Sequence, residues 1–209
     1  MSILCKLCEQ RRARRFCPGV EAEICPQCCG TGREITIDCP LDCTFLREAR
    51  IHERPAPLTA NDIPNLDIEV KESFVEEHEH EVMALSLALA RAMERERAVD
   101  LDAREAIDSL VRTYRTLRSG LIYESRPQNP FAARIQERLV NAIEELRKNI
   151  AEQTGMQTLR DTDVLATLVF LQRLEIQHNN GRRRGRAFFD FLRTYFPEST
   201  PDVQAGIQV

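Results

Sequence analysis

Hydrophobic residues recur at helical spacing through most of the chain after residue 68. Over residues 68–98 apolar side chains return every three, four or seven positions, which traces one buried helix face. The same spacing predicts further helices over residues 101–119, 131–153, 161–179 and 184–196. Apolar residues surround nearly the whole 161–179 helix, so we place it at the centre. The pattern predicts a mainly α protein with an all-helical bundle of about five helices.

Glycine, proline and short polar residues mark the ends of these predicted helices. Gly120 and Gly155 stand where a helix C-terminus commonly places glycine. Pro197 closes the last helix, because proline cannot donate the next backbone hydrogen bond. Asp100 or Asp102 is expected to cap the 101–119 helix, since a carboxylate accepts hydrogen bonds from the first free backbone N–H groups.

The first part of the chain has a different pattern. Residues 33–38 alternate between polar and apolar side chains, and we expect them to pair with residues 13–16 in a short hairpin. Residues 44–54 predict a helix, and prolines at 55, 57 and 64 disfavour regular structure after it. The expected domains are a cysteine-rich module at 1–54, a linker at 55–67, a helical bundle at 68–197 and a flexible tail at 198–209.

Cysteine spacing gives the strongest chemical signal in the sequence. All eight cysteines lie between residues 5 and 43, and they include two Cys-x2-Cys pairs and a final Cys-x3-Cys pair. Zinc takes four tetrahedral ligands, and such pairs supply two ligands from one tight turn. Eight thiolates make two closed sites, so we predict two structural Zn²⁺ ions without an open catalytic position. The predicted metal ligands are Cys5, Cys8, Cys17, Cys25, Cys28, Cys29, Cys39 and Cys43.

The eight cysteines can be divided between the two ions in three ways. We favour an interleaved cross-brace, because the adjacent Cys28 and Cys29 have diverging side chains that suit different ions. A sequential arrangement that puts Cys17 with the first pair is an alternative. In a third arrangement, His52 replaces one cysteine as a ligand. The alternative interpretation of His52 is a surface histidine at a helix end. In the favoured cross-brace, one ion is held by Cys5, Cys8, Cys25 and Cys28, and the other by Cys17, Cys29, Cys39 and Cys43.

The module needs its metal because its hydrophobic core is small. Residues 1–54 contain few large hydrophobic side chains, and domains of this size are marginal without disulfides or metals. A structural zinc site contributes on the order of 10 kcal/mol to folding in small peptides. We therefore expect the module to unfold without metal.

The cysteine-rich module resembles a known class of zinc finger. The elements that carry the likeness are the first Cys-x2-Cys, Arg-Phe-Cys-Pro at 15–18 and Cys-Pro-x2-Cys at 39–43 running into a helix. Together they resemble the two-zinc cross-brace fingers of the HIT and MYND type, with longer spacings and no terminal histidine-cysteine pair. Cys-Cys-Gly-x-x-Arg-Glu and Asp-Cys-Pro-x-Asp-Cys are also similar to a group of bacterial proteins without an assigned activity. The finger resemblance implies a protein-interaction module.

Two arginine clusters raise the alternative of a nucleic-acid-associated regulator. They cover residues 11–15 and 182–186, and the second precedes an aromatic-rich helix, a combination that can clamp single strands. The formal net charge of the chain is -4, so it has no global basic field. Arginines beside an anionic zinc-thiolate cluster also screen it and donate hydrogen bonds to sulfur, and we favour this second role for residues 11–15.

An enzyme with a site in the helical bundle is a further alternative. Glu77 with His80 and Glu175 with His178 have the Glu-x-x-His spacing of carboxylate di-iron bundles. At 100° per residue, the first pair faces away from the apolar stripe, so only Glu175 and His178 are placed for a buried site. Full zinc sites would leave no free cysteine nucleophile. The sequence therefore favours a non-enzymatic interaction or adaptor protein.

Composition sets the expected surroundings. No apolar run approaches the roughly 20 residues that span a bilayer, and the N-terminus lacks the pattern of a signal peptide. Many cysteines without a secretion signal favour metal thiolates in a reducing compartment. We expect a cytoplasmic protein with no membrane partner, which binds a protein partner or self-associates.

Overall fold

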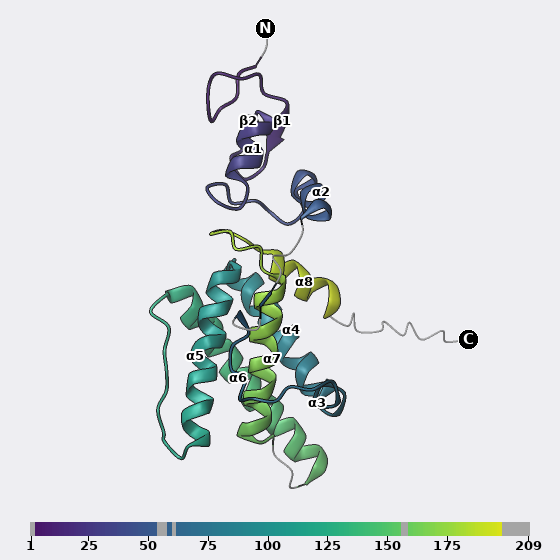
Figure 1. Ribbon diagram of the computed structural model, residues 1–209, viewed down its shortest axis with the longest axis vertical. Coiled ribbons are helices and arrows are strands. Elements are labelled where there is room, and N and C mark those ends of the chain that lie inside the picture. The colour runs from purple at the N-terminus through teal and green to yellow at the C-terminus, as the bar shows by residue number, and fades with distance from the viewer. Residues whose placement is uncertain (1–2, 54–57, 60–61, 156–158, 198–209) are drawn as a thin grey trace, which may run out of the picture.

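A computed structural model of the protein describes residues 3–53, 58–59, 62–155 and 159–197. The described chain is mainly helical, and its cysteine-rich module lies at one end of the helical bundle (Figure 1). The predicted fold class, a small hairpin followed by a helical bundle, is confirmed. The expected linker at 55–67 is described in part, and the expected tail at 198–209 lies outside the described residues.

The module contains one hairpin and two short helices. The hairpin pairs Phe16 with Glu23 at its centre, in antiparallel register. The prediction that residues 33–38 pair with residues 13–16 was wrong. Glu34 has a φ of 53°, a left-handed conformation that interrupts an extended strand. The elements are β1 (Arg15–Cys17), β2 (Ala22–Ile24), α1 (Pro26–Gly32) and α2 (Thr44–His52).

Helix α1 was not predicted from the sequence. It contains two cysteines and two glycines, which give no hydrophobic repeat. Cys25 precedes the helix with extended backbone, and its sulfur accepts a hydrogen bond from the Cys28 backbone N–H at 3.4 Å. Pro26 follows at the first helical position, where its missing N–H costs nothing. The helix start is therefore fixed by a cysteine cap and a proline, and not by periodicity.

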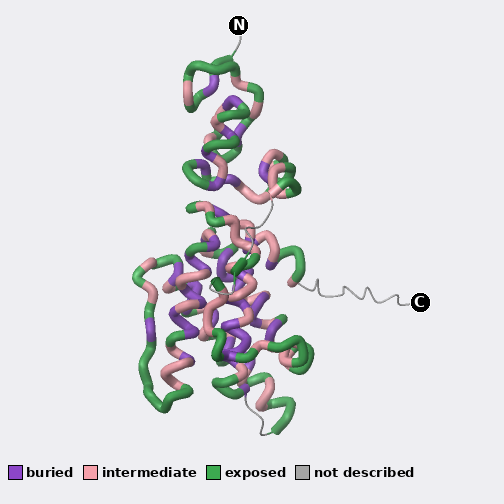
Figure 2. The backbone as a smooth tube through the Cα atoms, in the orientation of Figure 1, coloured by how far each residue is buried: buried purple, intermediate pink, exposed green. Residues whose placement is uncertain are grey.

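Helix α7, the helix predicted to be central, shares the core of the bundle with α4 and α5. Helix α7 packs against α4, α5 and α8, and α6 packs against α4 and α5. Buried residues line the facing sides of these helices (Figure 2). The bundle elements are α3 (Glu72–Glu77), α4 (Glu79–Glu96), α5 (Asp100–Arg118), α6 (Pro130–Thr154), α7 (Asp161–His178) and α8 (Ala187–Tyr195). The deepest side chains include Leu89, Met93, Ile107, Leu110, Ile135, Leu139, Ile143, Leu165, Leu168 and Phe188.

The predicted helix over 68–98 is shorter and divided. Its first residues are held outside a helix, because Arg173 of α7 donates to the backbone oxygens of Asn65 and Ile68. The helix then breaks at His78, whose ring lies 4.5 Å from that of Phe74. Four glutamates lie within three residues of this break, at positions 76, 77, 79 and 81. Like charges on neighbouring turns disfavour a continuous helix.

The module and the bundle meet at a buried carboxylate. The Glu34 side chain is fully buried, and it accepts hydrogen bonds from Arg50 at 2.8 Å and from Asn180 at 2.7 Å. Arg182 Nη1 and the Arg186 backbone N–H donate to the same carboxylate at 3.2 and 3.1 Å. Burial acts to raise the pKa of Glu34, but Arg50 and these donors hold that pKa below its usual value. The carboxylate is therefore charged, and it links the two parts of the chain.

A second acidic residue of the module extends this contact. Asp38 pairs with Arg186 at 2.6 Å and lies 4.0 Å from Arg184. Glu53, after α2, pairs with Arg182 at 2.5 Å. Three arginines of the 182–186 cluster thus hold the module on the bundle.

Asp100 caps a helix other than the one predicted. Its carboxylate accepts the backbone N–H groups of Phe188 at 3.0 Å and Phe189 at 3.1 Å, in the first turn of α8. The start of α5 is capped by Asp102, which accepts the Val99 N–H at 2.9 Å. Asp100 therefore fixes α8 against α5.

The Asp100 carboxyl predicts a pH-dependent contribution to stability. Burial raises the pKa of Asp100 to about 7, although the two backbone N–H donors act to lower it. The charges of Glu175 and Glu34 also act to raise this pKa. A carboxyl with a raised folded pKa stabilises the fold at low pH, and this stabilisation is lost as pH rises towards 7. We expect the difference in unfolding free energy between the wild type and the Asp100→Asn variant to change with pH. This difference should fall by about 1.4 kcal/mol for each pH unit between pH 5 and 7.

The measurement is equilibrium urea unfolding of both proteins across this pH range. The difference between them removes pH effects that they share, including those of the cysteines. A difference that stays constant with pH would mean that the two backbone donors keep Asp100 ionised throughout.

Candidate metal centre

Four cysteines converge near the N-terminus of α1. The sulfurs of Cys5, Cys8, Cys25 and Cys28 all lie within 4.8 Å of one another. Tetrahedral zinc with sulfur ligands at about 2.3 Å requires sulfurs about 3.8 Å apart, so the group fits the ion. These are the four cysteines that the cross-brace assigns to one ion. None of the eight cysteines, all of which lie in described residues, forms a disulfide.

Local structure brings these four residues together. Cys5 and Cys8 lie on the turn that follows residue 4, and the Cys5 N–H donates to Arg11 O at 2.8 Å. Cys25 and Cys28 lie at the start of α1, where one turn of helix brings positions three apart onto one side. A turn and a helix start therefore each contribute one Cys-x2-Cys pair.

The environment of this group stabilises thiolates at some positions. Burial acts to raise the pKa of Cys5, but backbone N–H donors lower it to about 6. The Cys28 N–H lowers the pKa of Cys25 as well. The Cys28 thiol donates to Cys25, which raises the pKa of Cys28 to about 12. The group thus has an anionic character that suits a divalent cation.

The remaining four cysteines surround a second position. Cys17, Cys29, Cys39 and Cys43 line one small cavity of the module, together with Ile24, Ile37 and Leu46. Burial raises the pKa of Cys39, and the charges of Glu34, Cys17 and Cys43 act in the same direction. Within the described residues, their sulfurs are not as close together as those of the first group. The structure brings these four around one space without showing a closed metal site.

Gly19 allows the chain to close around this second position. A Cβ atom at residue 19 would lie 2.3 Å from the backbone oxygen of Asp38, which is too close for any side chain. The hairpin turn therefore lies directly against the segment that leads into Cys39. This tight approach places Cys17 and Cys39 on the same cavity.

Two arginines point at the cysteine groups. Arg11 Nη1 lies 4.0 Å from the Cys25 sulfur, and Arg15 Nη1 lies 3.7 Å from the Cys29 sulfur. The Arg15 guanidinium also lies over the Phe45 ring, 4.3 Å from its centroid. The placement agrees with the predicted role of residues 11–15, in which arginines screen thiolates and donate to sulfur.

The other candidate ligands do not gather into a site. His52 is exposed at the end of α2 and belongs to neither cysteine group. Glu175 pairs with Arg104 at 2.8 Å, whereas the His178 ring stacks on Phe191 at 3.6 Å. The two side chains thus have separate partners, and no metal-ligand cluster forms around them within the described part of the chain.

Among the described helices, none is both long and apolar enough to cross a bilayer.

Comparison with known proteins gives no family assignment. No protein-family model matches the chain, and no significant match is found among curated proteins or solved structures. The chemistry of the site therefore carries the functional argument.

Proposed function

We propose that this protein is a non-enzymatic, zinc-binding interaction protein. In this proposal two Zn²⁺ ions fold the cysteine-rich module, and the module presents a rigid surface to a protein partner. The observation that carries the proposal is the group of four sulfurs within 4.8 Å, from Cys5, Cys8, Cys25 and Cys28. Four thiolates fill the coordination sphere of zinc and leave no position for a reacting water, so such a site is structural.

The proposal assigns the second ion to Cys17, Cys29, Cys39 and Cys43. Its support is that all four line one cavity, in which Arg15 also approaches the Cys29 sulfur. With the first group, this pairing gives the cross-brace, because Cys17 comes before Cys25 in sequence and belongs to the other ion. The resemblance to HIT and MYND-type fingers favours the same arrangement and stays a prediction.

The helical bundle has the role of a support in this proposal. Arg182 and Arg186 hold the module through Glu34 and Asp38. A surface held in this way has a fixed orientation relative to the bundle, which reduces the entropy cost of binding a partner. The same contacts weaken the nucleic-acid alternative, because they neutralise most of the second arginine cluster.

The metal content tests the proposal directly. We expect native mass spectrometry of anaerobically purified protein to show two zinc ions per chain, with elemental analysis of the same sample in agreement. Substitution of ¹¹³Cd should give two resonances, and couplings to cysteine β-protons should identify two sets of four. A Cys17→Ser, Cys39→Ser variant should keep one ion, held by the first group.

Other metal counts would contradict the proposal in distinct ways. One zinc ion with reactive thiols in the wild type would remove the second site. Couplings that join Cys17 to Cys5 and Cys8 would replace the cross-brace with the sequential arrangement. Bound iron would bring back an enzymatic function.

A further inference from the structure

The strand that leads into Cys17 has two faces with different chemistry. Side chains along an extended segment alternate between opposite faces. Arg11 and Arg15, four positions apart, point inward to the sulfurs of Cys25 and Cys29. Positions 12, 14 and 16 are exposed, whereas positions 13 and 15 are half-buried and position 17 is buried, so positions 12, 14 and 16 belong to the other face.

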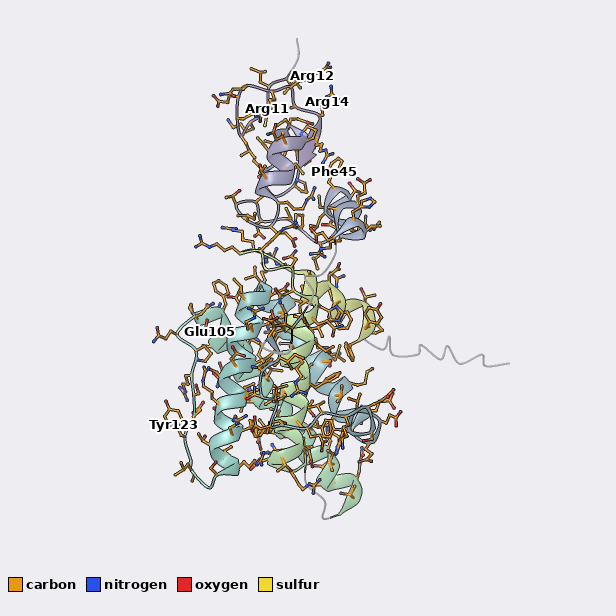
Figure 3. All side chains as sticks on the ribbon, viewed as in Figure 1. Arg11, Arg12, Arg14, Phe45, Glu105 and Tyr123 are labelled. Atoms are coloured by element: carbon orange, nitrogen blue, oxygen red, sulfur yellow. The ribbon has the colours of Figure 1, made fainter. Side chains whose placement is uncertain are left out.

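That other face contains Arg12, Arg14 and Phe16. Leu4 joins it, because Leu4 lies opposite Arg12 in an antiparallel bridge, and directly opposed residues share a face. Phe16 is 58% exposed and Leu4 is 54% exposed. We call these four residues the hairpin outer face. Figure 3 shows Arg12 and Arg14 at the end of the module that lies away from the bundle.

The two arginines of the hairpin outer face are free to bind. Among the described residues, neither Arg12 nor Arg14 makes a side-chain hydrogen bond or ion pair. By contrast, Arg182 and Arg186 pair with carboxylates of the module. The outer face thus combines two arginines without a partner in the described part of the chain and two exposed apolar side chains, with the Glu23 carboxylate beside Phe16.

We propose that the hairpin outer face binds an acidic peptide segment of a partner protein, in which carboxylates and aromatic or aliphatic side chains follow one another along the same face. Carboxylates of this segment pair with Arg12 and Arg14, and its apolar side chains cover Leu4 and Phe16. In an extended peptide, every second side chain faces the same way, about 6.6 Å apart. Arg12 and Arg14 are likewise two positions apart, on the segment that precedes β1. The inference rests on the proposed function, because the face exists only in the folded module.

The acidic surroundings of the face favour a peptide over nucleic acid. Glu23 lies directly opposite Phe16 in the hairpin, and Glu21 occupies the turn beside it. A single strand of nucleic acid carries a phosphate at every nucleotide, so a base stacked on Phe16 would bring phosphates against these carboxylates. A peptide can instead place its apolar side chains at Phe16 and its carboxylates at Arg12 and Arg14.

The test uses the full-length zinc-loaded protein and a defined probe. The probe is a fluorescein-labelled peptide made of alternating Glu-Asp-Phe and Glu-Asp-Leu units. Its binding is measured by fluorescence anisotropy. We expect saturable binding that weakens as salt rises, since the contacts are exposed ion pairs. An Arg12→Glu, Arg14→Glu variant should bind at least about tenfold more weakly, because two attractive contacts become repulsive.

Matched controls separate this face from general charge effects. Arg183→Glu changes an exposed arginine that is not part of the hairpin outer face, and it should leave binding unchanged. A probe with Gln and Asn in place of Glu and Asp should bind weakly, and so should a Phe16→Ser variant with the acidic probe. Zinc analysis of every sample shows whether the module is folded, so that a loss of metal is not mistaken for a loss of binding.

Several outcomes would overturn the inference. These are no binding of the acidic probe, binding that the double variant leaves intact, or tighter binding of labelled oligothymidine that depends on Arg12 and Arg14. Concentration-dependent self-association that the double variant abolishes would assign the face to a second copy of the chain. Each of these results can occur with two zinc ions bound, so each is distinct from failure of the metal sites.

Discussion

Removal of the metal from the intact protein is expected to unfold residues 3–53 and to leave the central helices of the bundle folded. The module's own core is small, because among its described residues the buried hydrophobic side chains other than cysteines are Ile24, Ile37 and Leu46. The bundle has a much larger apolar core that contains no cysteine. A structural zinc site contributes on the order of 10 kcal/mol to folding, so the module should lose its structure without it.

Hydrogen exchange measured by mass spectrometry follows both parts in one experiment. After chelation, amides of β1, β2 and α1 should exchange at least about a thousandfold faster, whereas those of α6 and α7 should be unchanged. The structure also predicts an effect across the interface. The Arg184 N–H donates to Glu34 O, and the Arg186 N–H donates to the Glu34 carboxylate. These two amides should lose protection together with the module.

A reversible experiment supplies the control. Addition of zinc to the chelated protein should restore protection in the module and at residues 184 and 186, whereas magnesium, which prefers oxygen ligands, should not. Protection of the module that survives complete metal removal, verified by elemental analysis, would contradict the structural role of zinc. Loss of protection throughout the bundle would mean that the two parts fold as a single unit.

Periodic elements were predictable from the sequence, and locally capped ones were not. Helices α5 and α7 begin and end within one or two residues of their predicted bounds, because a repeated apolar face is a signal spread over many positions. Helix α1 has no such repeat. It depends on Cys25 as a cap and Pro26 as its first residue, a signal that occupies only two positions.

The metal groups were partly predictable for a related reason. Cys-x2-Cys spacing identifies pairs, because the residues of one pair are neighbours in sequence. The pairing of Cys5 and Cys8 with Cys25 and Cys28, which the cross-brace predicted, is confirmed as a close sulfur group. The grouping of Cys17 with Cys39 depends on the close approach of Gly19 to Asp38, and no spacing rule contains that contact.

The interface between module and bundle had no sequence signal. Glu34 and Asn180 are hydrogen-bonded although 146 positions separate them. Residues 33–38 alternate as a strand would, yet Glu34 takes a left-handed conformation that carries its side chain into the interface. An arginine cluster such as 182–186 is usually solvated or bound to anions. Here the anions are carboxylates of the same chain, which only the three-dimensional structure brings near.

Replacement of Glu34 by alanine is expected to cause the largest destabilisation of any single substitution in the interface. The variant leaves Arg50 and Arg182, whose side chains are 13% and 27% exposed, without a central partner. Removal of one partner from a buried ion pair typically costs about 3–5 kcal/mol. Arg50 keeps its pair with Asp190 and Arg182 keeps its pair with Glu53, so we expect the lower end of this range. Glu34→Gln should be nearly as harmful, because its amide group would face other donors.

Urea unfolding followed by circular dichroism measures the loss, and small-angle scattering measures its effect on shape. We expect the radius of gyration of Glu34→Ala to increase, because the module separates from the bundle while both zinc ions stay bound. Glu53→Ala is the matched control. Glu53 also pairs with Arg182, but its side chain is 26% exposed, so its loss should cost about 1 kcal/mol or less.

The comparison of the two variants decides how the module is held. If Glu34→Ala costs no more than Glu53→Ala, burial does not make the Glu34 contact special, and many small surface contacts hold the module in place. If it costs several times more and the molecule extends, one buried carboxylate fixes the orientation of the module. Because Glu34 lies between Cys29 and Cys39 in sequence, its position would then depend on the second cysteine group, and metal binding would control how the module meets the bundle.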